Sequence, residues 1–155
     1  MSFNSSRGTR GVPQPAVVKP FFKWFNKFMA SRIRKTGKAF GNMPALVLTT
    51  VGAKSGIERT NPVAYFPDGQ GNWLIVASFA GAANNPAWYH NIAAHPDQVR
   101  INIDGRTETV TAEELHGAER ESAWQQITVA SQRFAQYQEK TDRQLPIIRL
   151  TAHRT

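Results

Sequence analysis

Two glycine-containing stretches hold the residues that could do chemistry. The first, VGAKSGIERTNP over residues 51–62, places Lys54, Ser55 and Arg59 around two glycines. Glycine lets backbone N–H groups face an anion, and lysine and arginine add charge-assisted donors. No Lys-Ser or Lys-Thr pair follows the second glycine, so the stretch is not a Walker loop. The pattern is compatible with a phosphate site, and an ordinary solvated hairpin is the alternative.

The second stretch, ASFAGAANNPAWYHN over residues 77–91, places small residues between a predicted strand and a helix that begins after Pro86. Small side chains let a flat ring lie against the backbone, and free amides at such a junction can bind ring carbonyls. A plain strand-to-helix turn has nearly the same composition. On the local pattern alone, Trp88, Tyr89 and Asn91 are better explained as core packing and a cap than as ligand contacts.

Other kinds of catalytic site find little support. The chain has no cysteine, which excludes thiolate nucleophiles and sulfur-ligated metal sites. His90 and His95 are five residues apart and fall on different faces of a helix, so we expect no metal site. Ser78 lacks the nucleophile-elbow pattern of a hydrolase. Glu113 and Glu114 are typical of a solvated helix entry.

Basic residues are concentrated at the N-terminal end of the chain. Residues 1–40 hold nine of the 19 lysines and arginines and no acidic residue, and the remaining ten face all 11 acidic residues. The net charge of +8 therefore belongs to this end, and the rest of the chain is near neutral. A nucleic-acid-binding domain would carry a basic face on its folded body, so we expect no nucleic-acid partner.

This N-terminal end divides into two segments. Residues 1–16 are rich in Ser, Gly, Arg and Pro without a period, which is typical of a flexible leader. Residues 17–38, and 20–35 in particular, predict an amphipathic helix with basic residues opposite the apolar ones. Its apolar side is Phe21, Phe25, Phe28, Met29 and Ile33, widened by Phe22 and Trp24. Such a helix either covers an open end of the domain or lies on an anionic membrane surface, and the added aromatic residues favour the membrane.

No apolar run reaches the ~18 residues of a membrane-spanning helix, and the N-terminus lacks the apolar core of a secretory signal. The absence of cysteine fits a reducing compartment. We therefore expect a cytoplasmic protein. If the N-terminal helix binds lipid, the protein would be peripheral on the inner face of the cell membrane.

Six short runs are typical of strands and two longer ones of helices. The strand-like runs are residues 46–50, 62–66, 73–78, 99–103, 107–112 and 147–150. Asp104-Gly105 is a strong signal for a tight hairpin turn. Residues 86–94 predict a short helix, and residues 117–141 predict one long helix with Phe134 facing inward.

A chain of 155 residues with 41% hydrophobic content fits one domain. Few of the short connections between these runs could serve as crossovers in a doubly wound parallel sheet, which favours antiparallel pairing. We predict a mostly β fold in which about six antiparallel strands form a barrel, with the N-terminal amphipathic helix and a long C-terminal helix. The domain would cover residues 17–155, with the barrel and its packed helices over 40–155.

Three segments together resemble one protein family. LVLTTVGAKSGIERTNPVAYF, VASFAGAANNPAWYHNIAAHP and YQEKTDRQLPIIRL occur in order and at the right separations over about residues 40–150. In these segments the chain resembles the deazaflavin-dependent nitroreductases and quinone reductases. The resemblance implies a split β-barrel similar to that of flavin-binding oxidases, which agrees with the strand pattern.

The resemblance implies that the cofactor is coenzyme F-420, an 8-hydroxy-5-deazaflavin. The residues that would hold its phosphate and acidic tail are Lys54, Ser55, Gly56, Arg59 and Thr60. Those that would line the deazaflavin ring are Ala77, Ser78, Phe79, Ala80 and Gly81, with Pro62, Trp88 and Asn91 completing the pocket.

The resemblance also implies the reaction, a hydride transfer from the reduced coenzyme to a quinone or a similar organic acceptor such as an enone. Ser78 and Tyr137 would be the catalytic donors, and Ser131, Phe134 and Tyr137 would contact the acceptor. Ser131 and Phe134 stand where the best-known nitroreductase of the family has tyrosines, which favours quinones over nitro compounds. Two alternatives stay open: a carrier that holds a deazaflavin or lipid-like molecule at the membrane without turnover, and a flavin mononucleotide oxidase.

Overall fold

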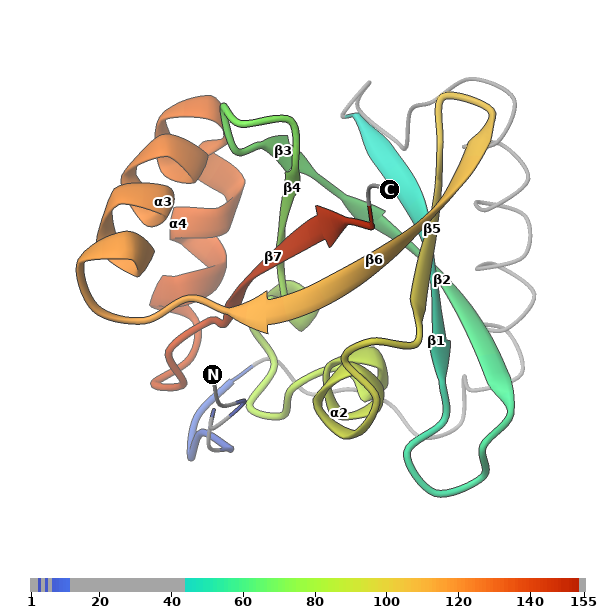
Figure 1. Cartoon of the computed structure of the whole chain (residues 1–155). Coiled ribbons are helices and arrows are strands. Elements are labelled where there is room, and N and C mark those ends of the chain that lie inside the picture. The colour runs from blue at the N-terminus through green and yellow to red at the C-terminus, as the bar shows by residue number, and fades with distance from the viewer. Residues whose placement is uncertain (1–2, 4, 6, 12–43, 154–155) are drawn as a thin grey trace.

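The computed structural model describes residues 3, 5, 7–11 and 44–153 (Figure 1). These residues form a curved sheet of seven strands with three α-helices and one short 3-10 helix packed around it. The predicted helix over residues 17–38 lies outside the described residues. Among the described residues, no helix is both long enough and apolar enough to cross a membrane.

Every strand pairs with its neighbours in antiparallel fashion, in the order β2-β1-β5-β6-β7-β4-β3. The strands are β1 (Ala45–Val51), β2 (Glu58–Ala64), β3 (Phe66–Pro67), β4 (Trp73–Val76), β5 (Val99–Ile103), β6 (Arg106–Glu114) and β7 (Ile147–Ala152). Because β2 and β3 are consecutive in the chain but lie at opposite edges of the order, the sheet must curl toward closure. The predicted split barrel is confirmed, with one more strand than expected because the two-residue β3 follows β2.

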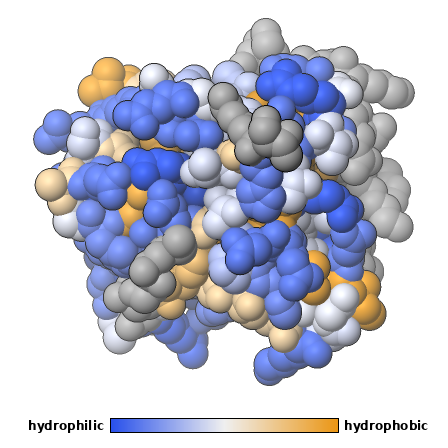
Figure 2. Space-filling model, viewed as in Figure 1, coloured by the Kyte–Doolittle hydropathy of each residue, from blue (hydrophilic) through white to orange (hydrophobic). Residues whose placement is uncertain are grey.

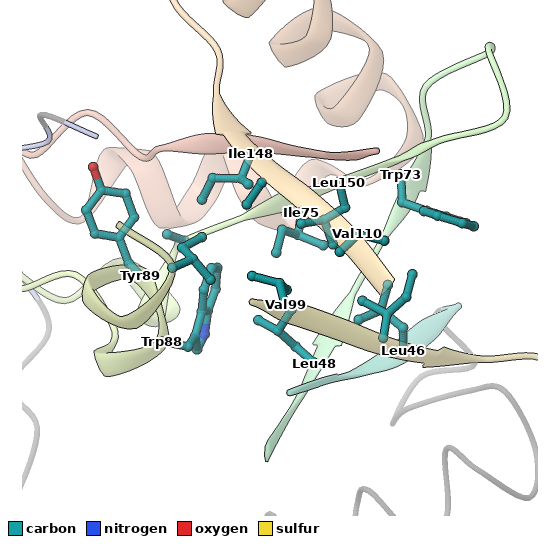
Figure 3. Close-up of a cluster of buried hydrophobic side chains, with 14 of the residues drawn as sticks. Leu46, Leu48, Trp73, Ile75, Trp88, Tyr89, Val99, Val110, Ile148 and Leu150 are labelled. Carbon is teal, nitrogen blue, oxygen red and sulfur yellow. The ribbon is translucent and has the colours of Figure 1, made fainter. Parts of the chain in front are cut away.

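The larger hydrophobic core fills the inner face of the sheet (Figure 3). Alternate residues of each strand point inward, and the register of β1 and β5 sets Leu48 beside Ile101, both almost fully buried. Helix α2 (Ala87–Ala94) adds Trp88 and Tyr89 to this core. Burying a side chain of this size contributes about 1.5–3 kcal/mol to the free energy of unfolding. The core therefore stabilises the curved sheet and the position of α2 against it.

A second core joins the other face of the sheet to α3 (Gly117–Ala130) and α4 (Gln132–Glu139), which lie together at one end of the molecule (Figure 1). The single long helix predicted over residues 117–141 is wrong in one respect. At Ser131 the backbone is extended, with φ −150° and ψ 107°, so the helical hydrogen bonds end there and restart in α4. Just after the break, Phe134 faces inward as predicted, and its ring meets that of Phe66 edge-on at 5.5 Å.

The predicted hairpin at residues 104–105 is confirmed. Asp104 and Gly105 have φ of 52° and 78°, as a tight turn between β5 and β6 requires. The first hairpin differs from expectation in its second strand, because β2 begins at Glu58 and not at Pro62. Arg59 and Thr60 therefore lie on a strand, which gives their side chains fixed directions.

The described residues of the predicted leader are hydrogen bonded to the barrel. Ser5 N donates to the hydroxyl of Tyr89 at 3.0 Å, and Gly8 N donates to the carbonyl of Ala83 at 2.8 Å. Residues 9–10 donate their amides to the carboxylate of Asp142. The leader thus passes over the junction between β4 and α2, which its composition did not indicate.

Candidate functional site

The turn between β1 and β2 is held by its own hydrogen bonds. Gly52 N donates to the carbonyl of Ile57 at 2.8 Å, and Gly56 N donates to the carbonyl of Gly52 at 3.0 Å. The Ser55 hydroxyl accepts from Ile57 N at 3.1 Å. Gly56 has φ of +69°, which side-chain-bearing residues rarely adopt. The turn is therefore a defined shape and not a loose loop.

Asn91 of α2 ties this turn to the body of the protein. Its Oδ1 accepts from Ala53 N at 3.0 Å, and its Nδ2 donates to the hydroxyl of Thr50 at 3.1 Å. Asn91 is 9% exposed and Thr50 is 1% exposed, so water cannot easily replace either partner. The side chain fixes the distance between the hairpin and the helix.

A pocket of about 1010 Å³ opens between this hairpin and α2. Its lining residues are Gly52, Ala53, Lys54, Ser55, Glu58, Arg59, Thr60, Asn61, Ala87, His90 and Asn91. Glu58 is paired with Arg100 at 2.6 Å, which offsets its negative charge. Among the described residues, no carboxylate pairs with Lys54 or Arg59, the two cationic side chains of the lining.

The pocket also offers backbone donors. Within the part of the chain that the structure describes, the amides of Lys54 and Ser55 have no protein acceptor, whereas those on either side are used by the turn and by Asn91. Two free amides beside two cationic side chains form a concavity that suits a phosphate or carboxylate group. Its chemistry fits the anionic part of coenzyme F-420.

Sequence reasoning found part of this lining. Of the residues that the resemblance assigned to the cofactor, the structure brings together Lys54, Ser55, Arg59, Thr60 and Asn91. The sequence prediction missed Ala87 and His90. A usable signal was present, because His90 and Asn91 follow Ala87 by three and four residues. Residues at these intervals share one face of a helix.

Other predicted cofactor residues do not line this pocket. Gly56 stands at the exposed apex of the turn, and Pro62 lies further along β2. Trp88 is 7% exposed and belongs to the main core, as the local pattern indicated (Figure 3). The indole is packed against strand residues because α2 presents Trp88 to the barrel and His90 to the pocket.

The second predicted segment, residues 77–81, forms the junction after β4. Ser78 has helical φ and ψ of −77° and −37°, and Phe79 has φ of +45° before Gly81 ends the 3-10 helix η3 (Phe79–Gly81). Among the described residues, the amides of Ser78, Phe79 and Ala80 have no protein acceptor. Amides in such an alternation of right- and left-handed backbone converge on one side. Donors for a ring or acceptor oxygen are therefore available at this junction.

Arg143, which the sequence analysis did not single out, holds this junction through hydrogen bonds to its carbonyls. Arg143 is 2% exposed, and its guanidinium donates to the carbonyls of Ala77, Ser78 and Ala82 and to Oδ1 of Asn85. Burial lowers the pKa of Arg143, and the nearby Tyr89 acts in the opposite direction. An arginine in a short connection between a helix and a strand looks like a surface residue, so its pattern carried no signal.

The predicted acceptor residues are only partly brought together. Tyr137 lies beside the junction, since a side chain at Gly81 would come within 2.8 Å of the Tyr137 carbonyl. Phe134 is 6% exposed and packs in the second core, and its predicted contact with the acceptor stays a prediction. Ser131 is half-buried at that break.

A buried polar pair lies behind α2. The hydroxyl of Tyr89 donates to the carboxylate of Glu114, and burial together with this hydrogen bond raises the pKa of Tyr89. Glu114 is 8% exposed, so its description as part of a solvated helix entry is wrong. It is the last residue of β6, and the sheet carries it under α2. Within the described residues, no group of three His, Asp or Glu side chains could hold a metal ion.

Comparisons with known proteins agree with this geometry. Residues 23–152 match the family described as F420H(2)-dependent quinone reductase. The F420H(2)-dependent quinone reductase Rv1261c of Mycobacterium tuberculosis is 39% identical over 114 residues, covering 72% of this chain and 75% of that protein.

Two solved structures are similar in fold and sequence. One is described as an F420-H2 dependent reductase, with 37% identity, a TM-score of 0.62, and coverage of 69% of this chain and 93% of that one. Another is described as a domain-swapped dimer, with 29% identity, a TM-score of 0.64, and coverage of 87% and 99%. The match over residues 23–152 and the 39% identical relative show that this chain belongs to the F420H(2)-dependent quinone reductase family, as a coenzyme F-420-dependent oxidoreductase, and the antiparallel split barrel agrees with this.

Proposed function

We propose that this protein reduces a quinone-like acceptor with reduced coenzyme F-420. The observation that carries the proposal is the pocket between the first hairpin and α2, where Lys54, Arg59 and two free amides converge. Bound there, the coenzyme supplies the hydride, and the protein binds and orients the reactants. The family description and the named relatives point to the same acceptor class.

The residues divide into two roles. Lys54, Ser55, Arg59 and Thr60 would hold the phosphate and acidic tail, because they supply cationic and hydroxyl donors on a rigid turn. Residues 77–81 would face the ring, because four of the five side chains are small and the amides of Ser78, Phe79 and Ala80 have no acceptor among the described residues. Ser78 and Tyr137 are the proposed donors toward the acceptor oxygen, where negative charge develops during reduction.

Quinones are favoured over nitro compounds as acceptors. Of the three positions assigned to the acceptor by resemblance, Tyr137 alone carries a phenol, and Phe134 packs in the second core. The loss of phenolic donors weakens support for a nitro group, whose two oxygens need several donors. A quinone needs one donor at each carbonyl as it is reduced.

The experiment is to mix purified protein with reduced coenzyme F-420 and menadione and to follow the return of oxidised-coenzyme absorbance against a no-enzyme control. Catalysed reoxidation is the expected result. Binding of the coenzyme without turnover of menadione or longer-chain quinones would overturn the reductase and favour the carrier. A protein purified with bound flavin that ignores the deazaflavin would favour the flavin mononucleotide oxidase.

We further propose that residues 20–35 bind an anionic membrane surface, where lipid-soluble quinones reside. The support is the sequence pattern of basic and aromatic residues. Exchanging Lys23 and Lys27 for glutamate should weaken cosedimentation with vesicles containing anionic lipid while leaving turnover of menadione unchanged. Equal cosedimentation of the variant and the original protein would refute membrane binding through this segment.

A further inference from the structure

The guanidinium of Arg143 is fully occupied by the junction between β4 and α2. Its Nη1 donates to the Ala77 carbonyl at 2.9 Å and to Oδ1 of Asn85 at 2.5 Å. Its Nη2 donates to the carbonyls of Ser78 at 2.9 Å and Ala82 at 3.0 Å, and its Nε donates to Ala82 at 3.2 Å. All three nitrogens and a full set of five hydrogen bonds are therefore directed at one short segment.

This cation is not neutralised by an acid. Arg143 is 2% exposed, and within the described residues no carboxylate pairs with it. Its backbone is fixed as well, because Arg143 N donates to the Thr141 hydroxyl and the Arg143 carbonyl accepts from Gln138. A buried, fixed charge compensated only by neutral acceptors acts strongly on their dipoles, since little water screens it.

Two of those acceptors share peptide groups with free amides. In a trans peptide, the carbonyl of one residue and the N–H of the next point in opposite directions. The peptide that binds Arg143 through the Ala77 carbonyl carries the N–H of Ser78, and the one that binds through the Ser78 carbonyl carries the N–H of Phe79. These N–H groups have no protein acceptor among the described residues. A cation on the carbonyl side withdraws electron density and strengthens the donor on the other side.

The same backbone aims these donors together. Ser78 is right-handed and Phe79 is left-handed with φ of +45°, an arrangement in which consecutive N–H groups converge. The left-handed conformation is unfavourable for phenylalanine, and the bonds from Arg143 to the carbonyls on both sides of Phe79, at Ser78 and Ala82, hold it.

We propose that Arg143 is a positioning residue, which fixes residues 77–82 and polarises the amides of Ser78 and Phe79 toward a ligand carbonyl oxygen that carries partial negative charge. This inference rests on the proposed function, which sets a ring or an acceptor against these amides. The oxygen belongs either to the deazaflavin ring or to the quinone, and the test distinguishes the two.

The sharpest test is Asn85→Asp. The change is nearly isosteric, keeps an oxygen acceptor for Nη1 of Arg143 and adds a negative charge beside the guanidinium. Within the part of the chain that the structure describes, the bond it loses is the long one from Nδ2 of Asn85 to the Ser5 carbonyl, at 3.4 Å. A purely structural Arg143 should be held at least as well by a carboxylate, whereas a polarising Arg143 should lose its effect. Asn102→Asp, on β5, is the control for the added charge.

The readouts separate the two ligands. If the amides bind the deazaflavin ring, N85D should move the absorbance maximum of bound oxidised coenzyme toward that of the free coenzyme and raise the Kd about fivefold. If they bind the quinone oxygen, the spectrum and Kd should stay as they are, and kcat with menadione should fall about tenfold. A folded N85D protein with unchanged spectrum, Kd and kcat would overturn the proposal.

Arg143→Lys gives a second measurement. Lysine keeps the charge but cannot make five hydrogen bonds, so it should show the same spectral or kinetic change as N85D. The matched control is Arg120→Lys, because Arg120 is also buried and donates to a carbonyl, that of Leu145, away from the junction. If R143K changes no more than R120K, the polarising role is wrong. Failure of the unaltered protein to bind or oxidise the coenzyme would instead refute the proposed function.

Discussion

Replacement of Asn91 tests whether the pocket holds an anion. Asn91→Ala removes two hydrogen bonds, to Ala53 N and from Nδ2 to the Thr50 hydroxyl, and leaves the buried Thr50 oxygen without this donor. At a net 0.5–1.5 kcal/mol each, the loss is about 2 kcal/mol in the free energy of unfolding. Asn91→Asp keeps the acceptor for Ala53 and should lose about half as much.

The affinities of the two variants for the coenzyme should be in the opposite order to their stabilities. The carboxylate in N91D faces the same pocket as Lys54 and Arg59, where it competes with the anionic tail for their charge. A repulsion of about 1.4 kcal/mol corresponds to a tenfold weaker Kd. N91D should therefore bind coenzyme F-420 about tenfold more weakly than N91A, although it is the more stable variant.

Urea unfolding gives the two stabilities, and fluorescence titration at two salt concentrations gives the affinities. The difference in Kd should shrink at high salt, because ions screen a partly exposed pocket. Asn102→Asp controls for net charge. Equal affinity of N91A and N91D at low salt would refute the assignment of this pocket to an anion.

The two remaining predictions concern pH and buried polar groups. The hydrogen bonds from the Thr9 hydroxyl and the amides of residues 9–10 lower the pKa of Asp142 to about 2, so docking of the leader should persist above pH 3.8 and be lost as pH falls toward 2. Amide chemical shifts of Thr9 and Arg10 across that range would record this, and a transition centred above pH 4 would contradict it. Because the pKa of Tyr89 is raised, its contribution to stability should be complete below pH 10 and decline above it. Tyr89→Phe removes the donor to buried Glu114 and should cost about 1–3 kcal/mol in urea unfolding at neutral pH; a loss under 0.5 kcal/mol would show that the pair matters little.

The sheet could be predicted because its signals are local. Alternation in Val99–Ile103 and the Asp104-Gly105 turn define a hairpin within a dozen residues, and the structure has both as expected. The division of the predicted C-terminal helix into α3 and α4 could not be predicted, because nothing in the sequence at Ser131 forbids a helix. Tertiary packing decides there, and the first turn of the helix after the break packs Phe134 against Phe66.

The hairpin wall of the pocket could be picked out from the sequence because cationic residues around glycines carry their own chemistry; that it binds an anion stays a prediction. The opposite wall of the pocket, on α2, could not be predicted, because Ala87 and His90 line the pocket only when α2 is placed against the hairpin. Arg143 is the extreme case. The acceptors of its guanidinium lie 58 to 66 residues away in the chain, and an arginine with five hydrogen bonds inside the protein has the same sequence signature as one in solvent.

The most direct test of the central claim pairs a change in the protein with a change in the ligand. The Kd values of the unaltered protein and of the Lys54→Ala, Arg59→Ala double variant would be measured for coenzyme F-420 and for its deazaflavin fragment without phosphate and tail. Two charge-assisted contacts of about 1.5 kcal/mol each predict a roughly 100-fold loss for the full coenzyme and little or none for the fragment. Equal losses for both ligands, or none for either, would contradict the assignment of this pocket to the anionic end of the coenzyme.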